Sequence, residues 1–169
     1  MFDGPVLGVD PGTAAVGLAV VEPGRHAVVR WAQTVRTPAG LAAPARLRRV
    51  HEAILAVIAD HRPAWMAVER LMWGRNAPTA MEVARASGVI VLAAEQSGVP
   101  VEEYAPLEVK MAVTGVGNAP KEVVRRSLAR LLGVEEVPVD ADAADAVAVA
   151  LCHIQQAPLR LGVREAAAR

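Results

Sequence analysis

The sequence predicts an α/β domain in which helices flank a mixed, five-stranded sheet. The first observation is a series of short apolar runs, rich in β-branched residues, at the start of the chain. The second is an alternation of helical segments with further apolar runs, which requires parallel crossovers. The third is the length of 169 residues, enough for one domain with a sizeable core.

The expected strands are short apolar runs bounded by turn residues. They are residues 6–9, 16–21, 27–35, 64–68 and 101–104. The first three follow one another closely, so they should form an antiparallel meander. The other two alternate with helices and should be buried strands that pair in parallel.

The expected helices are defined by apolar spacing and by their end signals. Leu47, Val50, Ile54 and Ile58 recur at helical spacing, and Pro63 ends this amphipathic pattern. Further helices are expected at 78–97 before Gly98, from Asn118 and Pro120 to Gly133, and from Asp140 as N-cap through Gln155.

Composition narrows the classes of protein that are possible. Ala (34 residues) and Val (27) supply most of the apolar content and only five residues are aromatic, so the core should be small and aliphatic. The longest stretch without a formal charge, 146–159, has 14 residues and includes polar ones, which excludes a membrane span. No basic region precedes the first apolar run, so we expect a cytoplasmic protein rather than a secreted one. We expect one domain over 1–157 and a flexible tail over 158–169.

The formal net charge is zero, but the charges are segregated along the chain. Residues 23–51 carry six arginines and no acid, whereas residues 131–159 carry five acids and no Lys or Arg. On charge alone we favour two ordinary solvated faces, because a dedicated nucleic-acid binder usually has an overall basic excess.

Four carboxylates stand where their neighbours predict burial. Asp10 ends the first strand and Glu69 follows the fourth, and the carboxyl ends of parallel strands are where α/β sheets place ligand sites. Asp142 and Asp145, spaced i and i+3, share one face near the start of the last helix. Helix capping is the alternative for this pair, and a simple hairpin turn is the alternative for Asp10.

Convergence of all four carboxylates would imply metal ions. Like charges a few ångströms apart stay ionised only if cations neutralise them; otherwise their pKa values rise. The single cysteine, Cys152, and the scattered histidines lack the spacing of zinc ligands, so oxygen must hold any metal. Clustered acids suit Mg²⁺ or Mn²⁺, and they commonly hold two such ions for phosphodiester chemistry.

The only lysines, Lys110 and Lys121, flank a loop that contains two glycines. This segment is not a P-loop, because Pro120 stands before the Lys and Glu122 after it. It should be a glycine-hinged loop that leads into a helix. Phosphate contact and an exposed surface role are both open for the two lysines.

Together these residues resemble the ordered motifs of the RuvC family of crossover (Holliday) junction endodeoxyribonucleases, over about residues 5–155. The matching segments are Gly8-Val9-Asp10-Pro11-Gly12-Thr13, Val68-Glu69-Arg70 with Asn76 downstream, Lys110, Gly115-Val116-Gly117 with Lys121, and Asp142-Ala143-Ala144-Asp145-Ala146. The order and spacing of the four acids carry the resemblance.

The resemblance implies a ribonuclease H-like fold and a homodimer that nicks four-way DNA junctions in pairs, in homologous recombination and DNA repair. It implies two Mg²⁺ ions per subunit, replaceable by Mn²⁺, held by the catalytic residues Asp10, Glu69, Asp142 and Asp145. It also implies that Lys110 and Lys121 contact DNA phosphate and that a branch-migration helicase complex is a partner.

The segment after Glu69 departs from the family pattern. The family often has an aromatic residue three positions after the Glu, where it stacks on bases, but here Met72 occupies that position and Trp73 follows. We expect this segment, including Arg75 and Asn76, to bind DNA, with Met72 or Trp73 inserted among unstacked bases. Packing beneath the sheet is the alternative.

The helix at 78–97 is apolar over more than one face, which predicts either the dimer interface or a fully buried core helix.

Two rival functions account for parts of the sequence. Residues 8–13 also resemble the first phosphate loop of the actin, Hsp70 and sugar-kinase superfamily, but those ATPases need two lobes and this chain provides one. A non-catalytic junction-binding module would gain nothing from four acids placed against phosphates. Metal-dependent nicking separates the three functions.

Overall fold

The computed structural model describes residues 4–12, 14–38, 40–72, 77–135, 137 and 140–167. Its elements, in chain order, are β1 (Val6–Asp10), β2 (Ala15–Glu22), β3 (Val28–Arg36), α1 (Ala43–His61), β4 (Trp65–Glu69), α2 (Ala77–Gln96), β5 (Val101–Tyr104), α3 (Pro106–Thr114), α4 (Lys121–Leu132) and α5 (Ala141–Ala167).

The five strands form one mixed sheet in the order β3-β2-β1-β4-β5. β1, β2 and β3 pair antiparallel, whereas β4 is parallel to both β1 and β5. The predicted meander and the predicted parallel crossovers are therefore both confirmed. The crossovers bring the carboxyl ends of β1 and β4 to the same edge of the sheet, as they must for parallel neighbours.

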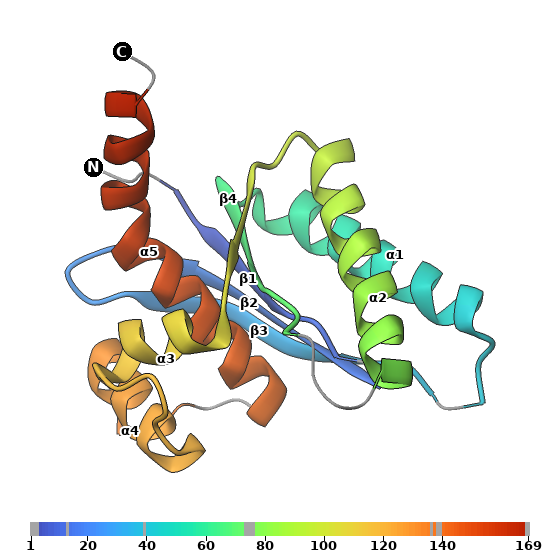
Figure 1. Cartoon of the computed structure of the whole chain (residues 1–169), viewed down its shortest axis with the longest axis horizontal. Coiled ribbons are helices and arrows are strands. Elements are labelled where there is room, and N and C mark those ends of the chain that lie inside the picture. The colour runs from blue at the N-terminus through green and yellow to red at the C-terminus, as the bar shows by residue number, and fades with distance from the viewer. Residues whose placement is uncertain are drawn as a thin grey trace.

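Helices cover both faces of the sheet, with α1 and α2 on one side and α3, α4 and α5 on the other (Figure 1). Side chains alternate between the two faces along each strand. Leu7 and Val9 on β1 belong to the core under α1 and α2, whereas Val6 packs with the core under α5. Asp10, two residues beyond Gly8 and four beyond Val6, therefore belongs to the α5 face.

The helices begin and end close to the predicted positions, with two differences. α4 follows Pro120 and ends at Gly133, whose φ of 69° provides the left-handed turn. α3 is a separate helix that the sequence patterns did not delimit. α5 continues beyond Gln155 and through Pro158 to Ala167. Leu159, Arg160 and Leu161, which follow Pro158, are good helix formers, and the helix extends through the proline.

Among the described residues, no helix combines the length and the apolar character needed to cross a membrane.

Candidate active site

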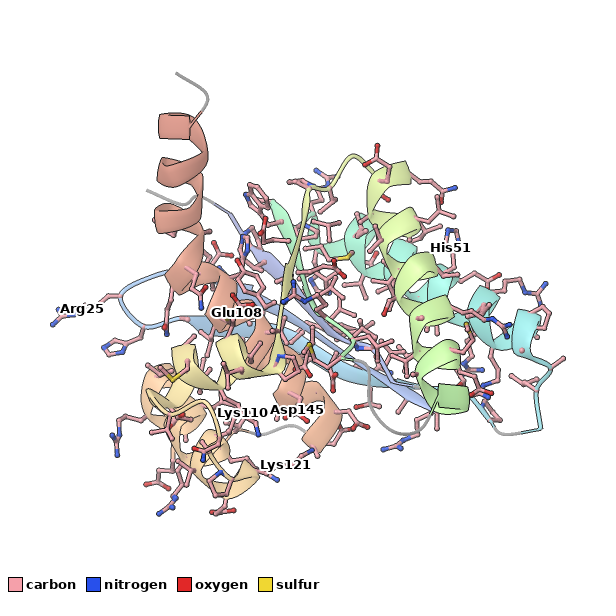
Figure 2. All side chains as sticks on the ribbon, viewed as in Figure 1. Arg25, His51, Glu108, Lys110, Lys121 and Asp145 are labelled. Atoms are coloured by element: carbon pink, nitrogen blue, oxygen red, sulfur yellow. The ribbon has the colours of Figure 1, made fainter. Side chains whose placement is uncertain are left out.

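A cavity of about 340 Å³ lies at the carboxyl ends of β1 and β4, between these strands and helices α3, α4 and α5. It is lined by Asp10, Glu69, Pro106, Val109, Lys110, Lys121, Val124, Asp145 and Ala148. The cavity therefore brings together three of the four predicted carboxylates and both predicted lysines. Figure 2 shows Lys110, Lys121 and Asp145 gathered from three helices, with Arg25 and His51 elsewhere on the molecule.

Strand register places the two acids of the sheet beside each other. Asp10 is the last residue of β1, Glu69 is the last residue of β4, and Val9 pairs with Val68 in the parallel ladder. The two carboxylates therefore leave the same edge of the sheet from adjacent strands, on the face that α5 covers.

Two strand glycines let α5 lie directly on the sheet. A Cβ added at Gly8 would lie 2.1 Å from the carbonyl oxygen of Ala146, and one added at Gly17 would lie 1.9 Å from that of Asp142. Only glycine permits this approach, and a glycine inside a strand is a known sign of close backbone contact. The backbone of α5 thereby brings Asp142 and Asp145 toward Asp10.

Asp142 does not line the cavity, but its charge contributes to the raised pKa of Asp10. The N-cap of α5 is Asp140, as predicted: its Oδ1 accepts a hydrogen bond from the backbone N–H of Ala143 at 3.0 Å. Asp145 forms an ion pair with Lys121, with 3.2 Å between Nζ and Oδ2. Asp140, rather than Asp142 or Asp145, is therefore the residue that caps α5.

Asp10 and Glu69 have raised pKa values. Burial, then the charges of Asp145 and Asp142, raise the pKa of Asp10 to about 6. Burial, then the charges of Asp10 and Asp145, raise the pKa of Glu69 to about 7. Lys121 opposes both shifts, Lys110 opposes that of Glu69, and Asp145 raises the pKa of Lys121. The site thus holds more negative charge than its two lysines neutralise.

Local hydrogen bonds fix the two ends of α3, the helix that carries Lys110. The Glu108 side chain accepts a hydrogen bond from the backbone N–H of Ala105 at 2.7 Å, which fixes the start of α3 one turn before Lys110. At the other end, the Thr114 hydroxyl donates to the Lys110 carbonyl at 2.8 Å and accepts from the Val116 N–H at 3.0 Å. These bonds close the loop that carries the chain from α3 toward Lys121.

The donor set of the cavity fits a hard divalent cation, because it consists of carboxylate oxygens whose repulsion a cation would relieve. Within the part of the chain that the structure describes, no three Asp, Glu, His or Cys side chains are gathered closely enough to hold one ion. Lys121 instead provides the counter-charge of Asp145.

The predicted DNA-binding segment after β4 is only partly described. Met72 is 58% exposed and does not line the cavity, so it does not pack beneath the sheet. Trp73, Arg75 and Asn76 lie outside the described residues.

Helix α2 is not the fully buried core helix that the sequence allowed. Ile90 is fully buried against the sheet core, but Met81, Val91 and Leu92 are exposed. A substitution meant to test an interface therefore belongs at Leu92, because a change at Ile90 would disrupt the core.

Most arginines of the segment 23–51 form ion pairs with acidic side chains. Four of its six arginines have acidic partners, namely Arg30 with Glu22, Arg36 with Asp140, Arg46 with Glu82, and Arg48 with Glu52. This agrees with the solvated face favoured from charge alone.

Sequence patterns did not find two contacts that hold α5 in place. Tyr104, the register partner of Glu69, bonds through its hydroxyl to Nδ1 of His153 on α5 at 2.8 Å. Thr34 on β3 donates a hydrogen bond to Asp140 at the start of α5. No local signal predicts such pairs, because each joins residues far apart in the chain.

Comparison with known proteins gives consistent matches along the chain. A family model described as "Crossover junction endodeoxyribonuclease RuvC" matches residues 6–153. The chain is 47% identical to the crossover junction endodeoxyribonuclease RuvC of Moorella thermoacetica, over 97% of this chain and 99% of that protein. It is 44% identical to the RuvC of Salinispora arenicola, over 97% of this chain and 95% of that protein.

Solved structures match as well. Thermus thermophilus RuvC in complex with a Holliday junction substrate is 36% identical, with a TM-score of 0.87 over 93% of this chain and 96% of that chain. The yeast mitochondrial Holliday junction resolvase Ydc2 has a TM-score of 0.67 at 11% identity, over 92% of this chain and 80% of that chain, a likeness of fold alone. The RuvC matches confirm the predicted ribonuclease H-like fold.

Proposed function

Because the chain belongs to the RuvC family of crossover junction endodeoxyribonucleases, we propose that the cavity between β1, β4 and α5 is the site at which it cuts Holliday junctions. The observation that carries this assignment is the gathering of Asp10, Glu69 and Asp145 with two lysines around one cavity. An acidic floor beside basic side chains is suited to holding cations and a phosphodiester together.

Asp10, Glu69, Asp142 and Asp145 are the residues that would hold two Mg²⁺ ions, with Mn²⁺ able to replace them. The bound ions would lower the pKa of an attacking water and stabilise the leaving oxygen, which leaves 5′-phosphate and 3′-hydroxyl ends. The raised pKa values of Asp10 and Glu69 support this assignment, since burial and then the neighbouring carboxylates disfavour their ionised forms, and a bound cation would favour those forms.

Lys110 and Lys121 act as point charges that hold the backbone phosphates of the bound strand. Both line the cavity, and the side chain of Lys121 is 80% exposed, so it is accessible to DNA. Cation binding beside Asp145 would free the Lys121 ammonium from its ion pair and make it available to a phosphate.

A homodimer would place two such cavities on the two sides of a junction, so that opposing strands are nicked in a pair. The exposed apolar residues of α2, Met81, Val91 and Leu92, are the surface that supports this proposal. We also propose a cytoplasmic location with the DNA, and a branch-migration helicase complex as partner, on the family resemblance alone.

Met72 acts as the apolar wedge at the crossover, with Trp73, Arg75 and Asn76 continuing the DNA-binding segment. Its exposure, three residues after Glu69 at the end of β4, supports this role, because methionine serves as an apolar wedge between base steps in other DNA-binding proteins. Met72→Ala should reduce nicking and the fluorescence of a 2-aminopurine placed at the crossover, with little change in thermal midpoint. Unchanged nicking and fluorescence would remove Met72 from this role.

The assignment of the carboxylates is tested by amide substitutions. Asp10→Asn, Glu69→Gln and Asp145→Asn should each abolish nicking of a four-way junction while binding persists or tightens, because negative charge near phosphate is removed. Asp60→Asn on α1, an exposed acid outside the cavity, is the matched control and should nick like wild type. Wild-type turnover by an Asp142→Asn, Asp145→Asn double variant would overturn the assignment.

A further inference from the structure

One row of cross-strand pairs connects the cavity to the far edge of the sheet. Asp10 on β1 pairs with Gly17 on β2, and Gly17 pairs with Thr34 on β3. Cross-strand partners point to the same face, so all three positions face α5. Asp10 contributes a carboxylate to the cavity, and Gly17 lies under the first turn of α5. The Thr34 hydroxyl reaches the start of the same helix.

Thr34 and Asp140 join this row to α5. The Thr34 hydroxyl donates to Oδ1 of Asp140, and the same oxygen accepts the Ala143 N–H at 3.0 Å. Arg36, two residues along β3, lies with Nη2 3.9 Å from the other oxygen, Oδ2. Asp140 therefore both caps α5 and ties its first turn to β3.

The hydrogen bond between Thr34 and Asp140 sets the position of Asp142 and Asp145 on α5. Gly8 and Gly17 let the helix lie flat on β1 and β2, and the hydrogen bond between Tyr104 and His153 holds α5 about two turns beyond Asp145, but neither contact fixes its first turn. The hydrogen bond from Thr34 is a directional constraint at the first turn, two residues before Asp142 and five before Asp145. Thr34 is buried, whereas about half of the Asp140 side chain is exposed, so the hydrogen bond is shielded from water on the Thr34 side only.

We propose that Thr34 and Asp140 are positioning residues, which hold Asp142 and Asp145 in register with Asp10 and thereby set the cation affinity and nicking rate of the site. This inference rests on the proposed function of the cavity. Neither residue touches the substrate; each acts through the backbone of α5. Groups that hydrogen-bond directly to metal ligands typically change metal affinity or activity by about 10- to 100-fold, and because these two residues act one step further away, we expect an effect at the lower end of that range.

The test compares Thr34→Val, Thr34→Ser and a matched control, Thr37→Val. Valine keeps the shape of Thr34 and removes the hydroxyl, whereas serine retains it. Thr37 is also buried, but its hydroxyl donates to the Ala14 carbonyl at 3.3 Å and accepts from Arg46 at 3.2 Å, away from α5. Each variant is measured for thermal midpoint, junction affinity, nicking rate across Mn²⁺ concentrations, and the rise in thermal midpoint that Mn²⁺ causes.

We expect Thr34→Val to nick about 10-fold more slowly at limiting Mn²⁺, with a higher half-saturating Mn²⁺ concentration and unchanged junction affinity. Thr34→Ser should return to within about twofold of wild type. Thr37→Val should keep the wild-type Mn²⁺ requirement even if its thermal midpoint falls as far as that of Thr34→Val. A wild-type Mn²⁺ requirement in Thr34→Val, or an equal change in Thr37→Val, would overturn the proposal.

The Mn²⁺-induced rise in thermal midpoint separates this proposal from the proposed function. Failure of the wild-type chain to nick any junction would overturn the proposed function. The Mn²⁺-induced rise in thermal midpoint would still test the positioning role. A smaller rise in Thr34→Val than in wild type supports that role, and an equal rise contradicts it. If Thr34→Val does not fold, Asp140→Ala, which removes the oxygen that accepts from Thr34 and from the Ala143 N–H, is measured in its place with the same expected direction.

Discussion

Substituting Gly17 by alanine should move the start of α5 and disable the site. The added Cβ would lie 1.9 Å from the Asp142 carbonyl oxygen, and real contacts of this kind are at least 3.0 Å, so the helix must retreat by about 1.1 Å. A misplacement of about 1 Å in catalytic groups costs on the order of 10²-fold in rate. The overpacking itself costs about 1–3 kcal/mol of the free energy of unfolding.

The assay pairs the thermal midpoint with the rate of junction nicking. The stability loss corresponds to a fall of about 2–12 °C in thermal midpoint for a domain of this size. Nicking, measured well below the lowered midpoint, should fall about 100-fold because Asp142 leaves its register with Asp10. Gly40→Ala is the control, since nothing lies within 4 Å of its added Cβ, and it should match wild type in both measurements. Gly17→Ala that nicks within about twofold of wild type would refute this account of how α5 is placed.

Other expectations follow from the same geometry. The pKa of Asp10 is raised to about 6 and that of Glu69 to about 7. At a pH above their ordinary pKa values, the native state therefore binds more protons than the unfolded state. The metal-free protein should lose stability as the pH rises from about 4 through 7. Thermal melts in chelator across this range check it, and a slope that is equally steep in Glu69→Gln would contradict it. Lys110→Ala and Lys121→Ala should each flatten the slope of log affinity against log salt by about 0.9 on duplex arms, and an unchanged slope in both leaves the lysines as surface residues. Leu92→Arg should give a folded monomer in sedimentation, with single nicks in place of paired ones, and a dimer that survives the change would move the interface elsewhere.

Strand and helix order could be predicted from the sequence because it depends on local patterns. Apolar runs gave the five strands, and Pro120 and Gly133 marked the two ends of α4. The continuation of α5 through Pro158 could not be predicted, because a proline inside a helical pattern usually ends or kinks the helix.

The positions of three acids around the cavity could be predicted because strand ends and helical spacing are also local features. Asp10, Glu69 and Asp145 line one cavity, as the pattern of the chain suggested. The contact between Thr34 and Asp140 could not be predicted, since it joins residues 106 positions apart. It depends on the register of β2 and β3, which shifts between Val20 and Val21, and no single-sequence pattern specifies such a shift.

The most direct test of the central claim is the nicking of a four-way DNA junction by the wild-type chain in Mg²⁺ and in chelator, beside Asp145→Asn and the Asp60→Asn control. The account predicts paired nicks that require the cation, disappear in Asp145→Asn and persist in Asp60→Asn, with junction binding retained throughout. Nicking that continues in chelator, or in Asp145→Asn at the wild-type rate, would contradict the claim that this carboxylate cavity is the active site.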